Sequence, residues 1–332
     1  MEKRKKTHSA VYFFLILILA LVMLYSGLRI LESTVFSADE YQEPTYASRT
    51  IVHDGVEYYP RNDITVLLAM GIDEYGPAVS SGSHRNNGEA DAVILMILDH
   101  TKETYSLLCL NRDTMVTMPA LGVNGRKAGT YYGQLALAHT YGEGLKDSCV
   151  NTKETVSDLL GGITINHYVA LNMDGISVVN DAVGGVTVHV TEDFSLVDSS
   201  IPMGTVKLNG SQAMHYVQSR MYVGNQLNIT RMDRHKDYME GLMSALREKH
   251  EDPKFVTELY DQVDEYVVTD CSTTVISNIL SRCADYTLDE VISPEGENKL
   301  TETFYEFYVD EEALADLCLR LFYAPKAAGG TR

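Results

Sequence analysis

The stretch DAVILMILDHTKETYSLLCLNRD, residues 91–113, decides the fold. Two apolar runs flank the polar segment DHTKE (99–103), which is the pattern of a β-hairpin with a longer turn. A hairpin brings the start of its first strand beside the end of its second strand. Because Asp91 opens the first strand, and Arg112 and Asp113 follow the second, we expect these three side chains at one edge of the sheet.

The segment ITVLLAMG (64–71) extends this prediction. It is a short apolar run of the kind that forms a buried strand, and it leads directly to Asp73. If this strand runs parallel to the second hairpin strand (104–110), the two strands end at the same edge. The spacing therefore predicts a four-residue cluster, in which Asp73 joins the three residues of the hairpin.

The rest of the chain alternates strand and helix patterns. Residues 74–90 are rich in Gly, Ser and Asn, which predicts a mobile loop. Helices are expected over 151–160, 173–185, 208–220 and 228–250, and strands over 167–172, 186–190 and 304–309. The first of these helices begins with capping residue types, and Asn209 is the expected cap of the third. This alternation predicts one α/β domain over residues 61–332.

The charge of the chain excludes nucleic acid as a partner. The 46 acidic residues outnumber the 27 basic ones, and the formal net charge is −19. Phosphates would be repelled by such a protein unless it had a basic face.

Between residues 218 and 236 the balance inverts. Four basic residues there face a single acidic one, Asp233; they are Arg220, Arg231, Arg234 and Lys236. Arg231, Arg234 and His235 are spaced to share one helical face near the helix N-terminus, where the macrodipole already favours an anion. Pairing of these arginines with acidic residues elsewhere is the alternative interpretation.

Aspartates at a strand edge and arginines on a helix are the two halves of a metal–diphosphate site. Carboxylates hold Mg²⁺, which is usually shared with substrate phosphates, and arginines clamp the remaining phosphate oxygens. In this interpretation the hairpin strand places Arg112 at a diphosphate. The alternative is an Arg112–Asp113 ion pair that only caps the sheet.

The N-terminus predicts a membrane anchor. Residues 10–28 contain no charged side chain, are long enough to span a bilayer, and follow the basic cluster KRKK. The positive-inside rule places residues 1–9 in the cytoplasm, an anchor over 10–30, a linker over 31–60 and the main domain outside. A cleaved signal peptide is the alternative, but the apolar run is long for one.

Five cysteines are present, without a C-x-x-C motif and without the spacing of zinc ligands. We expect Cys109, which falls within a strand, to be a small core residue. A disulfide between two of the others is left open.

Four motifs in order resemble the LytR–CpsA–Psr family of Gram-positive cell-envelope proteins. LLAMGID resembles the strand ending in Gly-x-Asp, and EADAVILMILD with LLCLNRDTMV resembles the two following strands. QLALAHTYGEG (134–144) and the block LNGSQAMHYVQSR with ITRMDRHKDYM complete the resemblance. It covers roughly residues 62–250 and, more loosely, 304–323.

The resemblance implies an extracytoplasmic α/β/α sandwich with a mixed central sheet, which binds a polyprenyl diphosphate lipid in an apolar groove. Family members transfer a glycopolymer phosphate, such as teichoic acid or capsule, from that lipid to peptidoglycan, with Mg²⁺ as cofactor. Carried over by position, Asp73 and Asp91 are the expected metal ligands. The catalytic residues are expected to be Arg112, Asp113 and Asp91, and the diphosphate-binding residues Arg112, Gln218, Arg220, Arg231, Arg234 and His235.

Four positions depart from the family pattern. Glu89 stands where the family often has Arg, Gln134 replaces Lys, Gln218 replaces the first Arg of an Arg-x-Arg pair, and His235 replaces Gln. These changes leave open a binding-only regulator of envelope assembly, and a hydrolase that uses water as acceptor is a third hypothesis. No G-x-S-x-G elbow or paired Cys/His motif suggests a Ser or Cys nucleophile.

Two features of the helices are left to the structure. His139 and His215 are interpreted as packing or solvent-facing residues. The apolar positions of 151–160, 173–183 and 210–218 form either ordinary core or the lining of a lipid groove.

Overall fold

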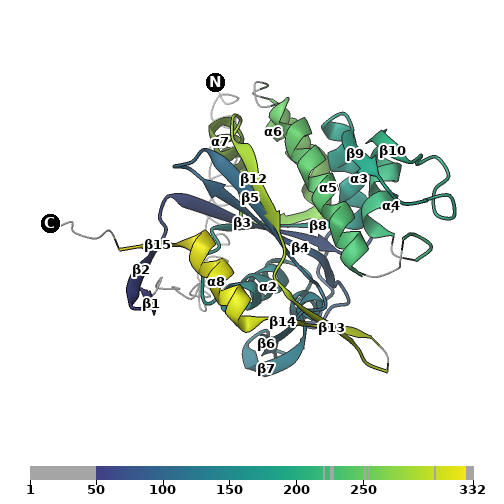
Figure 1. Ribbon diagram of the computed structural model, residues 1–332. Coiled ribbons are helices and arrows are strands. Elements are labelled where there is room, and N and C mark those ends of the chain that lie inside the picture. Colours follow the sequence, from purple (N-terminus) through teal and green to yellow (C-terminus); the bar gives the residue numbers. More distant parts are fainter. Residues whose placement is uncertain are drawn as a thin grey trace, which may run out of the picture. The chain divides into compact units, whose positions relative to one another are not determined.

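A six-stranded mixed sheet forms the centre of the protein (Figure 1). The computed structural model describes residues 50–219, 221–224, 228–249, 252, 254–302 and 304–326. The strand order is β11–β8–β3–β4–β5–β12. The bounds are β3 (Ile64–Ile72), β4 (Ala90–Asp99), β5 (Thr104–Leu110), β8 (His167–Asn172), β11 (Val267–Thr269) and β12 (Thr287–Ile292).

The hairpin prediction and its consequence are confirmed. Strand β4 pairs antiparallel with both β3 and β5, so β3 and β5 run parallel to each other. Ile72, at the end of β3, is paired with Ala90, and Leu110, at the end of β5, is paired with Val93. The segments that carry the four predicted site residues therefore leave the sheet at one edge.

One face of the sheet is covered by α2 (Lys146–Leu159) and α8 (Glu311–Phe322). Alternate residues of β3 and β4, such as Leu68 and Leu95, are fully buried in this layer. Both faces of the sheet are covered by helices, which explains why the strands are continuous apolar runs rather than alternating ones.

The other face carries α5 (Asn228–Arg247) and a second core next to it (Figure 1). This core is built by α3 (Met173–Ala182), α4 (Gly210–Gln218), α6 (Phe255–Val263), α7 (Thr273–Arg282), β9 (Val186–Val190) and β10 (Gly204–Leu208). The expected strands at 167–172 and 186–190 have the predicted bounds. The cap of α4 is also confirmed, because Asn209 and Gln212 form a reciprocal capping box.

Smaller elements surround this frame. They are the strands β1 (Ile51–His53), β2 (Val56–Pro60) and β15 (Tyr323–Pro325), the hairpins β6 (Met115–Leu121) with β7 (Lys127–Gln134) and β13 (Gly296–Leu300) with β14 (Tyr305–Val309), and the 3-10 turns η2 (Leu135–Thr140) and η3 (Asp264–Tyr266).

The predicted linker overlaps the folded unit. We expected all of 31–60 to be linker, but residues 51–60 contain β1 and β2, and β2 pairs with β15 near the C-terminus. Tyr58 packs against the main core from this small sheet. Asp54 and Gly55, both with positive φ, form the tight turn between β1 and β2, so a local hairpin signal was present, whereas the pairing with β15 is distant in the sequence.

Helix α2 begins at Lys146, earlier than the expected start at residue 151. Asn151 does not cap the helix, because its amide donates to the carbonyls of Pro119 and Ala138. Thr152 and Thr155 donate their hydroxyls to carbonyls one turn back in the same helix. The residue types that suggested a cap serve the buried interior of the helix instead.

The predicted anchor 10–30 and the cytoplasmic tail lie outside the described residues. Among the helices that the structure describes, none combines the length and the apolar character needed to span a bilayer.

All five cysteines are described and unbridged, and Cys109 is a buried core residue as expected.

Candidate functional site

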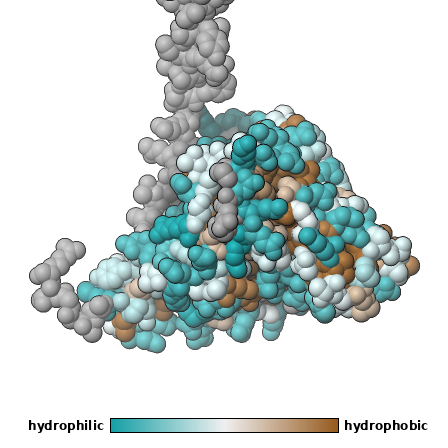
Figure 2. Space-filling view, turned by 90° about the horizontal axis from the view of Figure 1, so that it is seen from above, coloured by the Kyte–Doolittle hydropathy of each residue, from teal (hydrophilic) through white to brown (hydrophobic). Residues whose placement is uncertain are grey.

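An apolar cavity of about 290 Å³ lies between the sheet and the helices of the α5 face. Its walls come from β3, β4, β8 and β11 and from helices α3 to α7. Ile176 and Val179 of α3 and Val217 of α4 are lining residues, so these helices supply groove positions, whereas the buried positions of 151–160 belong to the α2 core. The surface in Figure 2, by contrast, is mainly hydrophilic, with apolar side chains gathered in limited patches.

The polar wall of the cavity contains Asp91 and Arg231. Both side chains are buried, and Arg231 Nη1 lies 2.6 Å from Asp91 Oδ2. Arg231 comes from the first half of α5 and reaches the sheet edge where β4 begins. The helix and the sheet edge that sequence spacing singled out are therefore in direct contact.

A β-bulge explains why Asp91 faces this cavity. Gly71 is paired with Ala92, whereas the next residue, Ile72, is paired with Ala90, so Asp91 is an extra residue without a partner in β3. In a regular strand, Asp91 and Ala92 would point to opposite faces. Both line the cavity, as the bend of a bulge permits.

Arg112 is held by three carboxylates. It forms ion pairs with Asp91 and Glu89, and its Nε lies 3.5 Å from Asp113 Oδ1. The arginine side chain is 13% exposed, so these interactions are only weakly screened by water. The structure therefore does not show a simple Arg112–Asp113 cap. Arg112 lies closer to Asp91, at the start of β4, and to Glu89, which precedes β4.

The turn after β5 is fixed from two sides. Asn111 Oδ1 accepts the N–H of Asp113, which ends the strand in a tight turn. Gln134 Nε2 donates to Asp113 Oδ1 at 3.0 Å and to the carbonyl of Tyr305 in β14 at 2.7 Å. Gln134, which replaces a lysine of the family pattern, thus positions Asp113 without adding charge.

His235 and Gln218 also line the cavity. His235 Nε2 donates to the carbonyl of Val217, and burial together with the charge of Arg231 lowers the pKa of His235 to about 3. His235 is therefore neutral and adds no positive charge. Gln218 Nε2 donates to the hydroxyl of Tyr75, which brings the 74–90 loop to the end of α4.

Arg234 has a different set of partners. Its guanidinium donates to the carbonyls of Tyr216 and Ser219 at the end of α4 and pairs with Glu192. It is 4% exposed and is not a lining residue of the cavity. The contacts of Arg234 therefore join α4 to α5, and Asp91 is not among its partners in the structure. Arg220, the neighbouring predicted contact, lies outside the described residues.

Asp73 is at the expected edge but is solvent-exposed. Its backbone N–H donates to the carbonyl of Glu89 at 2.9 Å, which fixes the two chain segments side by side. The ligand oxygens of Asp73, Glu89 and Asp91 do not converge within 4.8 Å in the structure. These carboxylates form an open arrangement rather than a closed metal cage.

The donor set nevertheless fits Mg²⁺. This ion takes oxygen ligands and is commonly held by one or two carboxylates while phosphates of the substrate complete its shell. Asp91 is buried, and its two oxygens are engaged by arginines, Oδ1 by Arg112 and Oδ2 by Arg231, so an ion would take the place of one of these contacts. Asp91 and Asp73 would hold the ion, and its chemistry would be to neutralise charge on phosphate oxygens.

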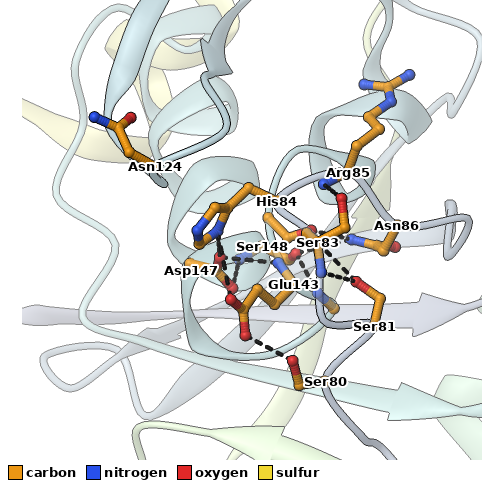
Figure 3. A network of polar contacts seen from close by, with 12 residues as sticks. Ser80, Ser81, Ser83, His84, Arg85, Asn86, Asn124, Glu143, Asp147 and Ser148 are labelled. Atoms are coloured by element: carbon orange, nitrogen blue, oxygen red, sulfur yellow. Dashed lines mark hydrogen bonds and ion pairs between the residues drawn. The ribbon is translucent and has the colours of Figure 1, made fainter.

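The 74–90 segment, which was predicted to be a mobile loop, is largely without regular secondary structure and is anchored by polar contacts (Figure 3). The Asn86 amide donates to the carbonyls of His139 and Gly142 and to Ser148 Oγ, at 2.9–3.0 Å. Ser80 Oγ donates to Glu143, and His84 lies 3.4 Å from Asp147. These contacts tie the loop, which ends at the candidate site, to the start of α2.

Gly142 is required in this network. Its φ of +142° is unfavourable for other residues, and an added Cβ would lie 2.4 Å from Ser148 Oγ. His139 is buried and bonds to the carbonyl of Gly88, whereas His215 bonds to Asp198; both agree with the packing and solvent-facing interpretation.

Sequence reasoning missed three residues of this region. Tyr75, Asn86 and Glu192 all contact segments distant in the sequence. No local pattern marks such residues, because their role depends on the tertiary fold.

A model of the LytR_cpsA_psr family matches residues 31–321, which is most of the chain. The chain belongs to the LytR–CpsA–Psr family.

Several relatives of the chain are named as teichoic acid transferases. The chain is 27% identical over 246 residues to the polyisoprenyl-teichoic acid–peptidoglycan teichoic acid transferase TagU of Enterococcus faecalis, covering 74% of this chain and 73% of the relative. The crystal structure of TagV from B. subtilis has a TM-score of 0.62 at 24% identity and covers 79% of this chain and 96% of that chain. A structure of TagT bound to LI-WTA has a TM-score of 0.60 at 19% identity, covering 83% and 96%. At these identities the solved structures establish the fold.

Proposed function

We propose that this LytR–CpsA–Psr protein is a membrane-anchored extracytoplasmic phosphotransferase. It moves a glycopolymer phosphate from a polyprenyl diphosphate lipid to peptidoglycan with the help of Mg²⁺. The transferase names of its relatives support this class of reaction. The observation that carries the proposal is the Asp91–Arg112–Arg231 cluster, which stands at the wall of an apolar cavity.

The cavity and the cluster match the two parts of such a lipid. Ligand pockets typically measure about 300–1,000 Å³, so about 290 Å³ accommodates part of a polyprenyl chain. The diphosphate would then lie at Asp91 and Arg231. Residues 10–30 are proposed to hold the domain at the membrane that contains the donor.

The arginines supply the electrostatic part of the reaction. An acceptor hydroxyl attacks the sugar-linked phosphorus and gives up its proton to water, the bond from that phosphorus to the bridging oxygen breaks, and polyprenyl phosphate leaves. Arg112 and Arg231 exchange protein carboxylates for phosphate oxygens and stabilise the charge that develops on them. Asp113 keeps Arg112 oriented, and Mg²⁺ at Asp73 and Asp91 would neutralise further charge.

The test is transfer by the full-length protein in detergent. It uses a polyprenyl-diphosphate-linked saccharide, Mg²⁺ and peptidoglycan fragments. Arg112→Ala and Asp91→Ala are expected to lower kcat/KM by about 100- to 1,000-fold, the usual effect of losing one charge-stabilising donor.

Arg61→Ala is the matched control. Arg61 is 14% exposed and pairs with Asp63 and Asp99 at the opposite edge of the sheet, so it loses a comparable ion pair away from the site. We expect it to retain transfer. Full activity of Arg112→Ala, with folding verified by thermal unfolding, would contradict the proposed site.

A lipid-binding regulator is the second candidate. Each described site arginine is already engaged by a protein acid, and Glu89 adds a negative charge where the family often has a positive one. Tight binding of the donor without product, under conditions where a related enzyme works, would favour the regulator. Release of product without any acceptor would favour the hydrolase.

A further inference from the structure

The end of the sheet opposite the candidate site holds a second group of chemically reactive side chains. His167 opens β8, and Asp270 and Cys271 follow the end of β11, which pairs antiparallel with β8. The opposite end of β8, at Asn172, is paired with Ile72 beside the candidate diphosphate site. The two groups therefore lie near opposite ends of the same strands of the sheet.

The three side chains converge on one point. His167 Nδ1 lies 3.4 Å from Asp270 Oδ1, and Cys271 Sγ lies 3.9 Å from the same oxygen. All three ligand atoms lie within 4.8 Å of one another. Among the described residues, this is the one group of three or more His, Cys, Asp or Glu side chains that meets this distance.

These separations match the edges of a metal-coordination tetrahedron. Zinc bonds of about 2.0–2.1 Å to nitrogen, 2.0–2.2 Å to oxygen and 2.3 Å to sulfur place tetrahedral N and O ligands about 3.4 Å apart, and S and O ligands about 3.6 Å apart. The observed 3.4 and 3.9 Å therefore require only small side-chain movements to enclose an ion.

The surroundings hold the donors in place. Asp270 Oδ1 accepts the backbone N–H of Tyr168 at 2.9 Å, and the Cys271 N–H donates to Thr269 Oγ1. Cys271 is 4% exposed, whereas the side chains of His167 and Asp270 are 30% and 24% exposed. The thiol is thus shielded, and the imidazole and carboxylate leave a route from solvent.

We propose that His167, Asp270 and Cys271 bind a divalent transition metal, with zinc as the best match. The thiolate and imidazole donors exclude Mg²⁺ and Ca²⁺, which take oxygen ligands, whereas zinc accepts sulfur, nitrogen and oxygen together. Three protein ligands leave the fourth position of the tetrahedron for water. This site does not depend on the proposed transferase function.

The metal would fasten one end of the apolar cavity. Val169 and Thr269, on the two strands that carry the ligands, are lining residues. Cys271 directly precedes Ser272, the N-cap of α7, and Ile276 of α7 also lines the cavity. An ion at this point would join β8, β11 and the start of α7, and would stabilise that wall of the cavity without contacting the diphosphate site.

Cobalt substitution provides the test. The reduced full-length protein, purified without a histidine tag, is titrated with Co²⁺. We expect thiolate-to-cobalt charge-transfer absorption that saturates at about one equivalent and disappears when Zn²⁺ is added. Cys271→Ser should abolish this absorption, and His167→Gln should weaken binding by at least about tenfold.

Two controls localise the signal. Cys283→Ser removes a half-buried cysteine elsewhere and should leave the absorption unchanged, as should Asp91→Asn in the candidate diphosphate site. Absence of the absorption in the wild-type protein, or its loss in either control variant, would overturn the proposal. If Cys271→Ser does not fold, His167→Gln decides the outcome.

Discussion

The two faces of the central sheet differ in how completely they are filled. On the face toward α2, Leu68, Leu95 and Leu108 are fully buried in one continuous core. On the face toward α5, the neighbouring residues Ala69, Gly71 and Ala92 line a cavity of about 290 Å³. The strands are the same, but successive residues point to opposite faces.

The difference shows that side-chain size on alternate positions creates the cavity. Large residues of β3 fill the α2 face, whereas Ala69 and Gly71 leave space on the α5 face. A Cβ on Gly71 would lie 3.3 Å from the Cβ of Ala92, which is closer than most side-chain contacts. One layer of the protein thus stabilises the fold, and the other leaves room for a ligand.

Enlarging an alanine on each face tests this division. Ala170 of β8 is 2% exposed in the α2-side core, whereas Ala69 of β3 lines the cavity. Ala170→Leu should lower the free energy of unfolding by about 1–3 kcal/mol through overpacking. Ala69→Leu should change it by less than about 1 kcal/mol while weakening binding of the polyprenyl diphosphate donor. Chemical denaturation and lipid binding measure the two effects, and equal destabilisation would contradict the comparison.

His235, a partly buried histidine that lines the cavity on the α5 face, makes stability depend on pH. Burial lowers the pKa of His235 to about 3, below the unfolded value of about 6.5, so the unfolded state binds the extra proton between these values. Stability is therefore lost as the pH falls below about 6.5, by at most about 1.4 kcal/mol per pH unit.

His235→Gln preserves a donor for the Val217 carbonyl and should flatten this part of the pH–stability curve. The exposed His189→Gln is the control and should leave the slope unchanged. The expectation concerns unfolding between pH 6.5 and 5, and an unaltered slope in His235→Gln would refute it.

The smallest expected effect concerns Glu89, one of the three acids that hold Arg112. Glu89→Gln removes one of its carboxylate partners and leaves Asp91 and Asp113 in place. Release of Arg112 for phosphate should tighten donor binding by a few-fold, corresponding to about 0.5–1 kcal/mol for a partly exposed ion pair. Equilibrium binding of the lipid measures this change, and weaker binding would show that Glu89 helps to hold the ligand.

The sequence predicted the parts of the site that follow from strand spacing. Asp91 and Arg112 meet as expected because a hairpin determines which of its residues share an edge. Arg231 was placed on the correct helix and face, but helical spacing does not identify the partner across the fold. For this reason Arg234 shared the same prediction, although it binds carbonyls at the end of α4.

Other features depend on contacts that no local pattern contains. Strand β2 pairs on one side with its neighbour β1, but its other side pairs with β15 from the far end of the chain. Likewise, His167 and Cys271 carry none of the usual zinc-ligand spacing, and only the pairing of β8 with β11 brings them together.

Because of the bulge at Asp91, the number of residues at the start of β4 determines which way the Asp91 side chain points. Deletion of Ala90 would allow the ladder between β3 and β4 to close in regular register. Asp91 would then occupy a paired position and turn with Val93 toward the α2 core, although every named site residue would still be present. A comparison of homologous sequences should therefore count residues between Gly88 and Val93 as carefully as it matches their identities.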